Sequence, residues 1–263
     1  MLARERLDAA RSALRKEDNE AALAGLIWFH EHALEESRGW AGVRLSYALN
    51  DWTALATRYP PAMNALRETR ERTAMALFGA TGDRHDFHDI VSIDDKLGQA
   101  AATYRLFLRL EHEKPALAIE CGPLILEALI LERDFARAAK VLPVSEQSIC
   151  KAGAALDRDM QFLKHAKFTR SPTRWAFTVN YLEKVRNVIA IAKGLGQTAE
   201  ATALARLAVS QVRDPALRRS VKAGLVRWPP APRIGHKRYG LQALRARRRA
   251  TAERRRARIM RSL

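Results

Sequence analysis

Apolar residues recur along most of this chain at helical rather than strand spacing. Leu7, Ala10 and Leu14 form one stripe three and four residues apart. Two further stripes comprise Phe87, Ile90, Val91 and Leu97, and then Ile125, Leu126 and Leu129. Prolines stand between such stripes, where a missing N–H costs little, at Pro60–Pro61, Pro115, Pro143, Pro172 and Pro215. Since Ala, Leu, Arg and Glu also favour helix, the pattern predicts an all-α chain of roughly a dozen helices.

Four stretches share one design, in which a helix ends, a tight polar turn follows and a second helix opens with small residues. They are RKEDNEAALAGLIWF (15–29), KLGQAAATYRLF (96–107), LERDFARAAKVL (131–142) and GLGQTAEATALARLA (194–208). A fifth, YALNDWTAL (47–55), is predicted to contain the turn but has Leu55 in place of the small residue. We expect neighbouring helices to approach closely at the small residues Ala22, Ala138 and Ala201.

This design resembles the tetratricopeptide repeat, a helix–turn–helix unit of about 34 residues. The matched turn residues are 33, 48, 35 and 63 positions apart: Asp18, Asp51, Gln99, Asp134 and Gln197. The gaps of 33 and 35 fit the repeat, the gap of 48 leaves room for an added helix around 62–78, and the gap of 63 could contain a degenerate unit. WAGVRLSY (40–47) approximates the family signature through Trp40, Val43 and Tyr47, although Arg44 replaces its glycine.

The resemblance implies an α-solenoid of antiparallel helix pairs over about residues 1–215, within a helical-repeat domain at 1–226. A generic helical bundle is the alternative. In tetratricopeptide units the first helix of each pair lines a concave groove. This mapping assigns a partner groove to His85, His88, Asp89, Ser92, Asp95, Glu120, Glu127, Glu183, Arg186 and Asn187. Because several of these residues are acidic, we expect a positively charged protein or peptide as the ligand.

Charge is concentrated at the C-terminal end. The chain has 46 Lys and Arg against 29 Asp and Glu, a formal net charge of +17, and residues 227–263 hold thirteen of the basic residues and a single acid, Glu253. We interpret 227–235 as a Pro-rich linker and 236–263 as an Arg-rich tail that becomes helical when bound to an anion. The candidate anion-binding residues are Arg245, Arg247, Arg248, Arg249, Arg254, Arg255, Arg256 and Arg258.

Three partners are compatible with this basic C-terminal extension, besides an unbound, solvated tail. They are nucleic-acid phosphates, an acidic protein, and the acidic groove of this chain or of another copy. Membrane insertion is not expected, because the apolar residues of the tail are sparse. No apolar run reaches the roughly 20 residues of a membrane span. Two distant cysteines, Cys121 and Cys150, and the absence of a signal-peptide pattern predict a cytoplasmic protein without a disulfide framework.

The stretch GDRHDFHDI (82–90) is the strongest candidate for chemistry. His85 and His88, with Asp89, could bind a metal, and the stretch resembles the His–Asp pair of metal-dependent phosphohydrolases. Those enzymes need further ligands from other helices, and no partner motif is evident. The other interpretation is a helix start, with Asp83 as N-cap and Phe87, Ile90 and Val91 in the core.

The helix-start interpretation is the stronger of the two, because such a short motif specifies a site only weakly. No Gly-rich phosphate loop or nucleophile triad is recognisable, so no cofactor is expected. The sequence therefore predicts a non-enzymatic protein-binding scaffold or adaptor. A nucleic-acid-associated protein anchored by the tail is the main alternative. A metal-dependent hydrolase is the third.

Overall fold

The computed structural model describes residues 2–165 and 171–226, all of whose regular structure is helical. The prediction of an all-α chain is confirmed. The chain divides into two compact units, residues 1–134 and 135–263. The boundary falls within the region predicted to be a helical-repeat domain. No helix of the described ranges has an apolar stretch long enough to cross a membrane.

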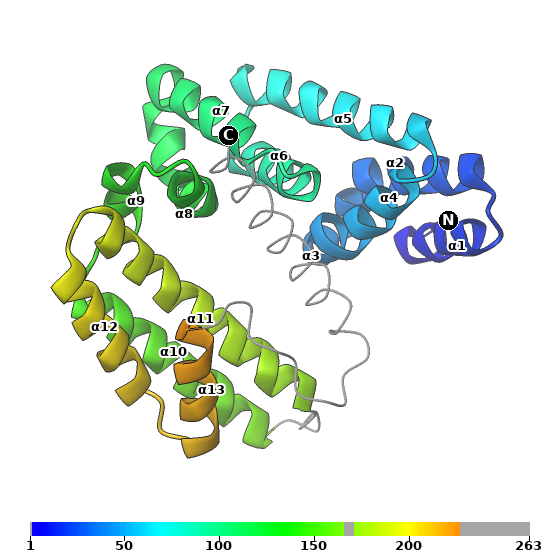
Figure 1. Cartoon of the computed structure of the whole chain (residues 1–263). Helices are drawn as coiled ribbons and strands as arrows, with labels where there is room; N and C mark the ends of the chain where they lie inside the picture. Colours follow the sequence, from blue (N-terminus) through cyan, green and yellow to red (C-terminus); the bar gives the residue numbers. More distant parts are fainter. Residues whose placement is uncertain (1, 166–170, 227–263) are drawn as a thin grey trace, which may run out of the picture. The chain divides into compact units, whose positions relative to one another are not determined.

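The first unit runs through a series of packed helices (Figure 1). They are α1 (Ala3–Arg15), α2 (Asn19–Glu36), η1 (Arg38–Trp40), α3 (Ala41–Val43), η2 (Arg44–Ala48), α4 (Leu49–Ala56), α5 (Pro60–Phe78), α6 (Arg84–Leu97), α7 (Ala100–Glu113) and α8 (Pro115–Leu131). The added helix expected around 62–78 is α5, which begins at a proline as predicted. The segment η2 is a π-helix.

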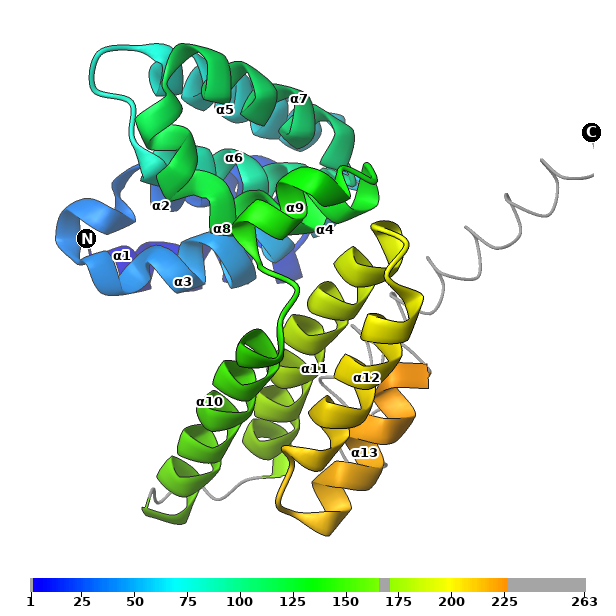
Figure 2. The ribbon, with the colours of Figure 1, turned by 90° about the vertical axis from the view of Figure 1, so that its left-hand side faces the viewer.

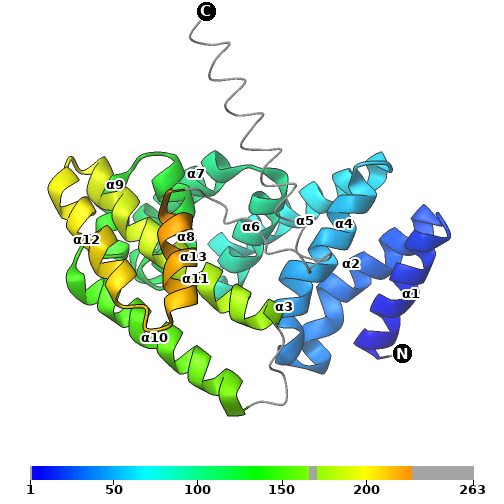
Figure 3. The same ribbon diagram turned by 60° about the horizontal axis from the view of Figure 1, so that its bottom comes forward.

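Close packing of α1 on α2 depends on small residues. The two helices lie side by side in Figure 3 and contact along their length. A Cβ atom added at Gly25 would lie 2.8 Å from the Cβ of Ala10, closer than side chains tolerate. Ala22, at the start of α2, has no exposed surface. The first helix pair therefore has the close approach that the sequence predicts.

Helix α6 is the centre of the first unit, since it contacts α4, η2, α5, α7 and α8. Phe87, Ile90 and Ile93 are fully buried on it, while Val91 is only partly buried. The core positions expected for Phe87 and Ile90 are confirmed. Side chains of α6 that do not point to solvent therefore pack against other helices.

Four of the five predicted turns are present. Asp18 caps α2 by accepting a hydrogen bond from the N–H of Ala21. Gly98, Arg133 and Gly196 lie in the other three turns with φ of 69°, 63° and 80°. These left-handed conformations reverse the chain between helices, and glycine adopts them without strain. Ala138 and Ala201, which follow two of these turns, are buried.

The turn predicted within YALNDWTAL is wrong, because α3, η2 and α4 form continuous helical backbone from 41 to 56. Leu49, Trp52 and Leu55 are buried at helical spacing and hold this segment against the core. Asp51 lies on its other side and accepts a hydrogen bond from Nε of Arg11 at 2.7 Å. The polar pair Asn50–Asp51 is thus the outer face of a helix rather than a break.

The second unit contains α9 (Phe135–Val141), α10 (Glu146–His165), α11 (Ser171–Gly194), α12 (Thr198–Ser210) and α13 (Pro215–Val226). Helices α10 to α13 lie side by side in Figure 2. Helix α11 contacts the other four and supplies much of the core, including Leu182 and Val185. Its Tyr181 hydroxyl donates to the carbonyl of Ala208 at 2.7 Å, which joins α11 to α12.

Candidate functional site

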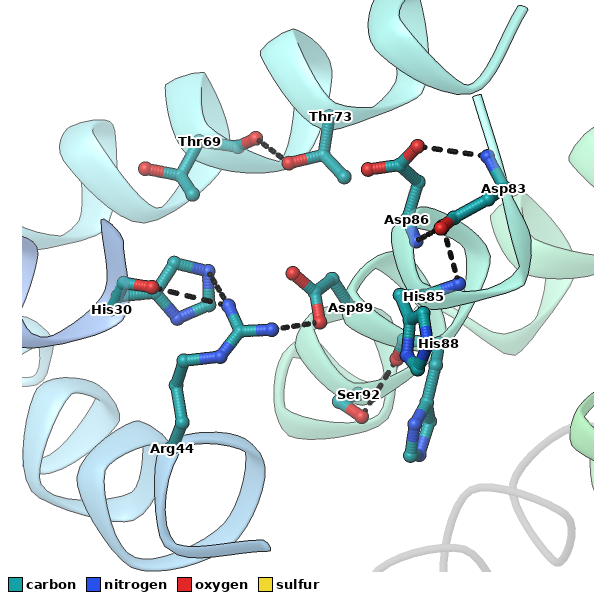
Figure 4. A network of polar contacts seen from close by, with 10 residues as sticks. All are labelled: His30, Arg44, Thr69, Thr73, Asp83, His85, Asp86, His88, Asp89 and Ser92. Atoms are coloured by element: carbon teal, nitrogen blue, oxygen red, sulfur yellow. Dashed lines mark hydrogen bonds and ion pairs between the residues drawn. The ribbon is translucent and has the colours of Figure 1, made fainter. Parts of the chain in front are cut away.

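The stretch GDRHDFHDI forms the start of α6, and its first aspartate caps the helix (Figure 4). Asp83 Oδ1 accepts from the backbone N–H groups of His85 at 2.7 Å and Asp86 at 3.1 Å. Asp86 returns the interaction by accepting from the N–H of Asp83 at 3.0 Å. This reciprocal pair satisfies N–H groups that have no partner within the helix. The predicted N-cap is confirmed, and two of the three aspartates are structural.

The third aspartate, Asp89, forms a buried ion pair with Arg44. Nη2 of Arg44 lies 2.5 Å from Oδ1 of Asp89, and the two side chains are 6% and 13% exposed. Nη1 of the same guanidinium donates to Nε2 and to the carbonyl oxygen of His30, both at 3.2 Å. Figure 4 shows the guanidinium of Arg44 between His30 and Asp89. Three helical segments, α2, η2 and α6, meet at this cluster.

Burial governs protonation in the cluster. Burial, together with the charges of Arg44 and Arg72, lowers the pKa of His30 to about 3, so the imidazole is neutral at neutral pH. Because Nε2 accepts from Arg44, the ring proton lies on Nδ1. Burial raises the pKa of Asp89 and the charge of Arg44 opposes it. The 2.5 Å contact with a guanidinium keeps this carboxylate ionised at neutral pH.

Helix α6 carries a second buried carboxylate that the sequence analysis did not single out. Asp94 has no exposed surface. It accepts from Nε and Nη2 of Arg70 on α5, both at 3.0 Å, and from the hydroxyl of Thr103 on α7 at 2.8 Å. The sequence does contain an indication of this burial, because Asp94 lies four residues after Ile90 and seven after Phe87, on the apolar face of the helix.

The predicted groove residues of the first unit fall into two groups. His85, Asp95, Glu120 and Glu127 are exposed, whereas His88, Asp89 and Ser92 are partly buried. Burial lowers the pKa of His88, and the Ser92 hydroxyl donates to the carbonyl of His88 at 2.8 Å. Helices α6 and α8 are in contact, and Nε of Arg84 donates to the carbonyl of Glu120 at 3.2 Å. This hydrogen bond joins the start of α6 to α8.

The remaining predicted site residues lie elsewhere. Glu183, Arg186 and Asn187 are on α11 of the second unit, where Nη1 of Arg186 donates to the carbonyl of Gly224 at 3.1 Å. Burial lowers the pKa of Arg186. The eight arginines assigned to anion binding, Arg245 to Arg258, lie outside the described residues, as do the predicted linker and tail.

The described residues contain no group of three or more His, Cys, Asp or Glu side chains placed to hold a metal ion. Of the three ligands that the metal hypothesis requires, Asp89 is committed to Arg44, and His85 is exposed at the helix start. Cys121 is buried, and burial raises the pKa of its thiol to about 11, so it is not a thiolate at neutral pH. The cluster thus has the chemistry of a structural ion-pair network.

No family model, curated protein or solved structure matches the chain.

Proposed function

We propose that this protein is a non-enzymatic scaffold that binds a positively charged protein partner through the exposed polar side of α6 and α8, and that its Arg-rich tail recruits an anionic partner. The proposal rests on one observation: the polar groups of this stretch that could take part in chemistry already form structural interactions. Asp83 and Asp86 cap a helix, Asp89 neutralises Arg44, and Ser92 bonds to its own helix. Side chains engaged in such interactions stabilise the surface of the unit but are poorly suited to proton transfer or nucleophilic attack.

The two buried ion pairs support a binding role in another way. Asp89 and Asp94 connect α6 to η2, α5 and α7, so the central helix is fixed from three sides. Its solvent side presents His85 and Asp95, and the adjacent α8 presents Glu120 and Glu127. A surface on a rigid element loses little conformational entropy when a partner binds. The first unit holds 22 acidic against 17 basic residues, which favours a basic partner.

Site-specific photo-cross-linking tests this proposal. A photoreactive amino acid is placed at His85 and at Asp95 in living cells, and cross-linked proteins are identified by mass spectrometry. The control position is Arg4, which lies on α1 and is 80% exposed. We expect one basic protein to be captured from both α6 positions and not from α1.

The charge-reversal variant D95K/E120K provides the second arm of the test. It should abolish the capture while leaving the melting temperature unchanged, because both side chains are exposed. Capture that survives charge reversal would refute the proposed surface. So would a metal-dependent hydrolytic activity that His88→Ala removes.

A further inference from the structure

Charge is divided between the two units far more sharply than the overall composition suggests. Residues 1–134 carry 22 acids and 17 basic residues, a net charge of −5. Residues 135–263 carry 29 basic residues and seven acids, a net charge of +22. The basic character is therefore not confined to the Arg-rich tail. It extends into the folded helices of the second unit.

Helix α13 presents this charge to solvent. Leu217, Val221 and Gly224 are buried against the unit, and a Cβ added at Gly224 would lie 2.5 Å from Leu182. The opposite side carries Arg218, Arg219 and Lys222, all exposed, which we call the α13 basic face. Lys222 lies four positions after Arg218 and three after Arg219, so like charges are neighbours on adjacent turns. Among the described residues no acidic side chain forms an ion pair with any of the three.

Two further arginines lie near the start of α13. Arg213, which precedes the helix, is 83% exposed although its Nε lies 3.1 Å from Asp157. Arg174 pairs with Asp214, whose Oδ1 caps α13 by accepting from Ala216 and Leu217. Arg174 is the last residue of the basic run KHAKFTRSPTR (164–174). One end of that run thus contacts the residue that caps α13.

We propose that the α13 basic face binds the phosphate backbone of nucleic acid without reading its sequence. This deepens the proposed function by naming the class of its anionic partner. The charge density of the ligand supports the choice. Duplex DNA carries one negative charge per about 1.7 Å and holds condensed counterions, whose release drives binding to clustered Lys and Arg. Arginine also fits phosphate oxygens with two parallel hydrogen bonds.

The absence of base reading follows from composition. Aromatic side chains that stack on bases are scarce here, since residues 213–263 contain only Trp228 and Tyr239. Phosphate contacts position a protein on nucleic acid but carry no sequence information. The affinity should therefore depend strongly on salt and weakly on sequence.

The test is fluorescence anisotropy of the full-length protein with labelled RNA and duplex DNA of about 20 nucleotides, over a series of KCl concentrations. The variant R218Q/R219Q/K222Q removes three positive charges from the α13 basic face. The control R15Q/R67Q/R105Q removes three from exposed positions of the first unit, so the change in net charge is identical. Circular dichroism and thermal melting verify the fold of both.

We expect the α13 variant to bind at least about ten-fold more weakly and to lower the slope of log K against log salt by about 2 to 3, near one per phosphate contact. The control should remain within about two-fold of wild type. Equal losses from both triples would refute the proposal, because net charge alone would then explain binding. If the α13 triple melts early, Arg219→Gln and Lys222→Gln alone should each lower the slope by about one.

Two competitors identify the ligand class. Polyglutamate and phosphatidylserine vesicles are added at the same concentration of negative charge as the nucleic acid, and we expect neither to displace it. Displacement by polyglutamate would make an acidic protein the ligand, and displacement by vesicles a membrane surface; either result overturns the proposal. These readouts do not involve α6, so cross-linking at His85 and binding of nucleic acid can succeed or fail separately.

Discussion

Asp94 and Arg70 form a two-point ion pair inside the first unit. Nε of Arg70 lies 3.0 Å from Oδ1 of Asp94, and Nη2 lies 3.0 Å from Oδ2. The aspartate has no exposed surface and the arginine side chain is 11% exposed. Thr103 supplies a third donor to the same carboxylate. Both oxygens of Asp94 thus accept hydrogen bonds, and α5, α6 and α7 are joined at one point.

Removing one partner of this pair should destabilise the protein severely. Asp94→Ala leaves the guanidinium of Arg70 largely buried, with only the exposed carboxylate of Glu71 beside it. Loss of one partner of a buried ion pair typically costs about 3–5 kcal/mol in the free energy of unfolding. Asp95→Ala, at the exposed neighbouring position, should cost less than about 0.5 kcal/mol. Urea unfolding followed by circular dichroism measures both.

The double variant R70M/D94L separates a charge effect from a packing effect. Replacing a buried ion pair by apolar side chains of similar volume is often neutral. We therefore expect R70M/D94L to be considerably more stable than Asp94→Ala. If Asp94→Ala and Asp95→Ala cost the same, the ion pair is not a determinant of stability.

His30 should make the protein less stable in mild acid. The imidazole faces Arg44 from η2, Arg72 from α5 and the ring of Trp52 on α4. The unfolded chain binds a proton at His30 near pH 6.5, whereas burial lowers the pKa in the folded protein to about 3. Between these values the unfolded state holds one more proton. The free energy of unfolding should fall by about 1.4 kcal/mol per unit as the pH drops through this window.

Substitution identifies His30 as the origin of that slope. His30→Gln keeps a hydrogen-bond acceptor for Arg44 but cannot be protonated, so urea midpoints measured from pH 7 to pH 4 should depend less on pH than those of wild type. His32→Gln changes a residue of the same helix whose side chain is 41% exposed, and it serves as the control. A slope that His30→Gln leaves intact would assign the acid sensitivity to other groups.

Local signals predicted the helices and turns well, because they depend on residues close in sequence. Proline positions and the turns at Asp18, Gly98, Arg133 and Gly196 agree with the structure. The error at Asp51 has a physical cause. A polar pair inside an apolar pattern marks either a turn or the outer side of a helix, and the choice depends on whether the flanking residues pack, as Trp52 does.

The buried charges were not predicted, because each depends on a partner far away in sequence. Arg44 lies 45 residues from Asp89, and Arg70 lies 24 from Asp94. Sequence periodicity did place Asp94 on an apolar face, and Arg44 stands where the tetratricopeptide signature has glycine, so both positions were unusual. Neither observation identifies the partner. The predicted groove contained Asp89 but not Arg44. The role of that groove as a binding surface remains a prediction.

Gly98 should be intolerant of substitution for a conformational reason. It ends α6 with a φ of 69°, and no neighbouring atom would obstruct an added Cβ. Gly98→Ala should therefore cost about 1–2 kcal/mol through backbone strain alone. Gly42 also has open space around it but lies within α3, so Gly42→Ala should stabilise the protein by about 0.4–1 kcal/mol. Thermal melting of the two variants should give shifts of opposite sign, and shifts of the same sign would contradict this reasoning.

Gly25 and Ala10 should be coupled, because only one of the two positions can carry a methyl group. A Cβ at Gly25 would lie 2.8 Å from that of Ala10 and 3.4 Å from its Cα, so Gly25→Ala forces α1 and α2 apart. Ala10→Gly alone removes a buried methyl group and weakens α1. The double variant A10G/G25A moves the methyl group from one helix to the other and relieves the overlap. In a double-mutant cycle from urea unfolding, it should be more stable than the sum of the single effects by about 1–3 kcal/mol. Additive effects would mean that α1 and α2 adjust freely to the extra methyl group, and close approach would then not explain the small residues of this helix pair.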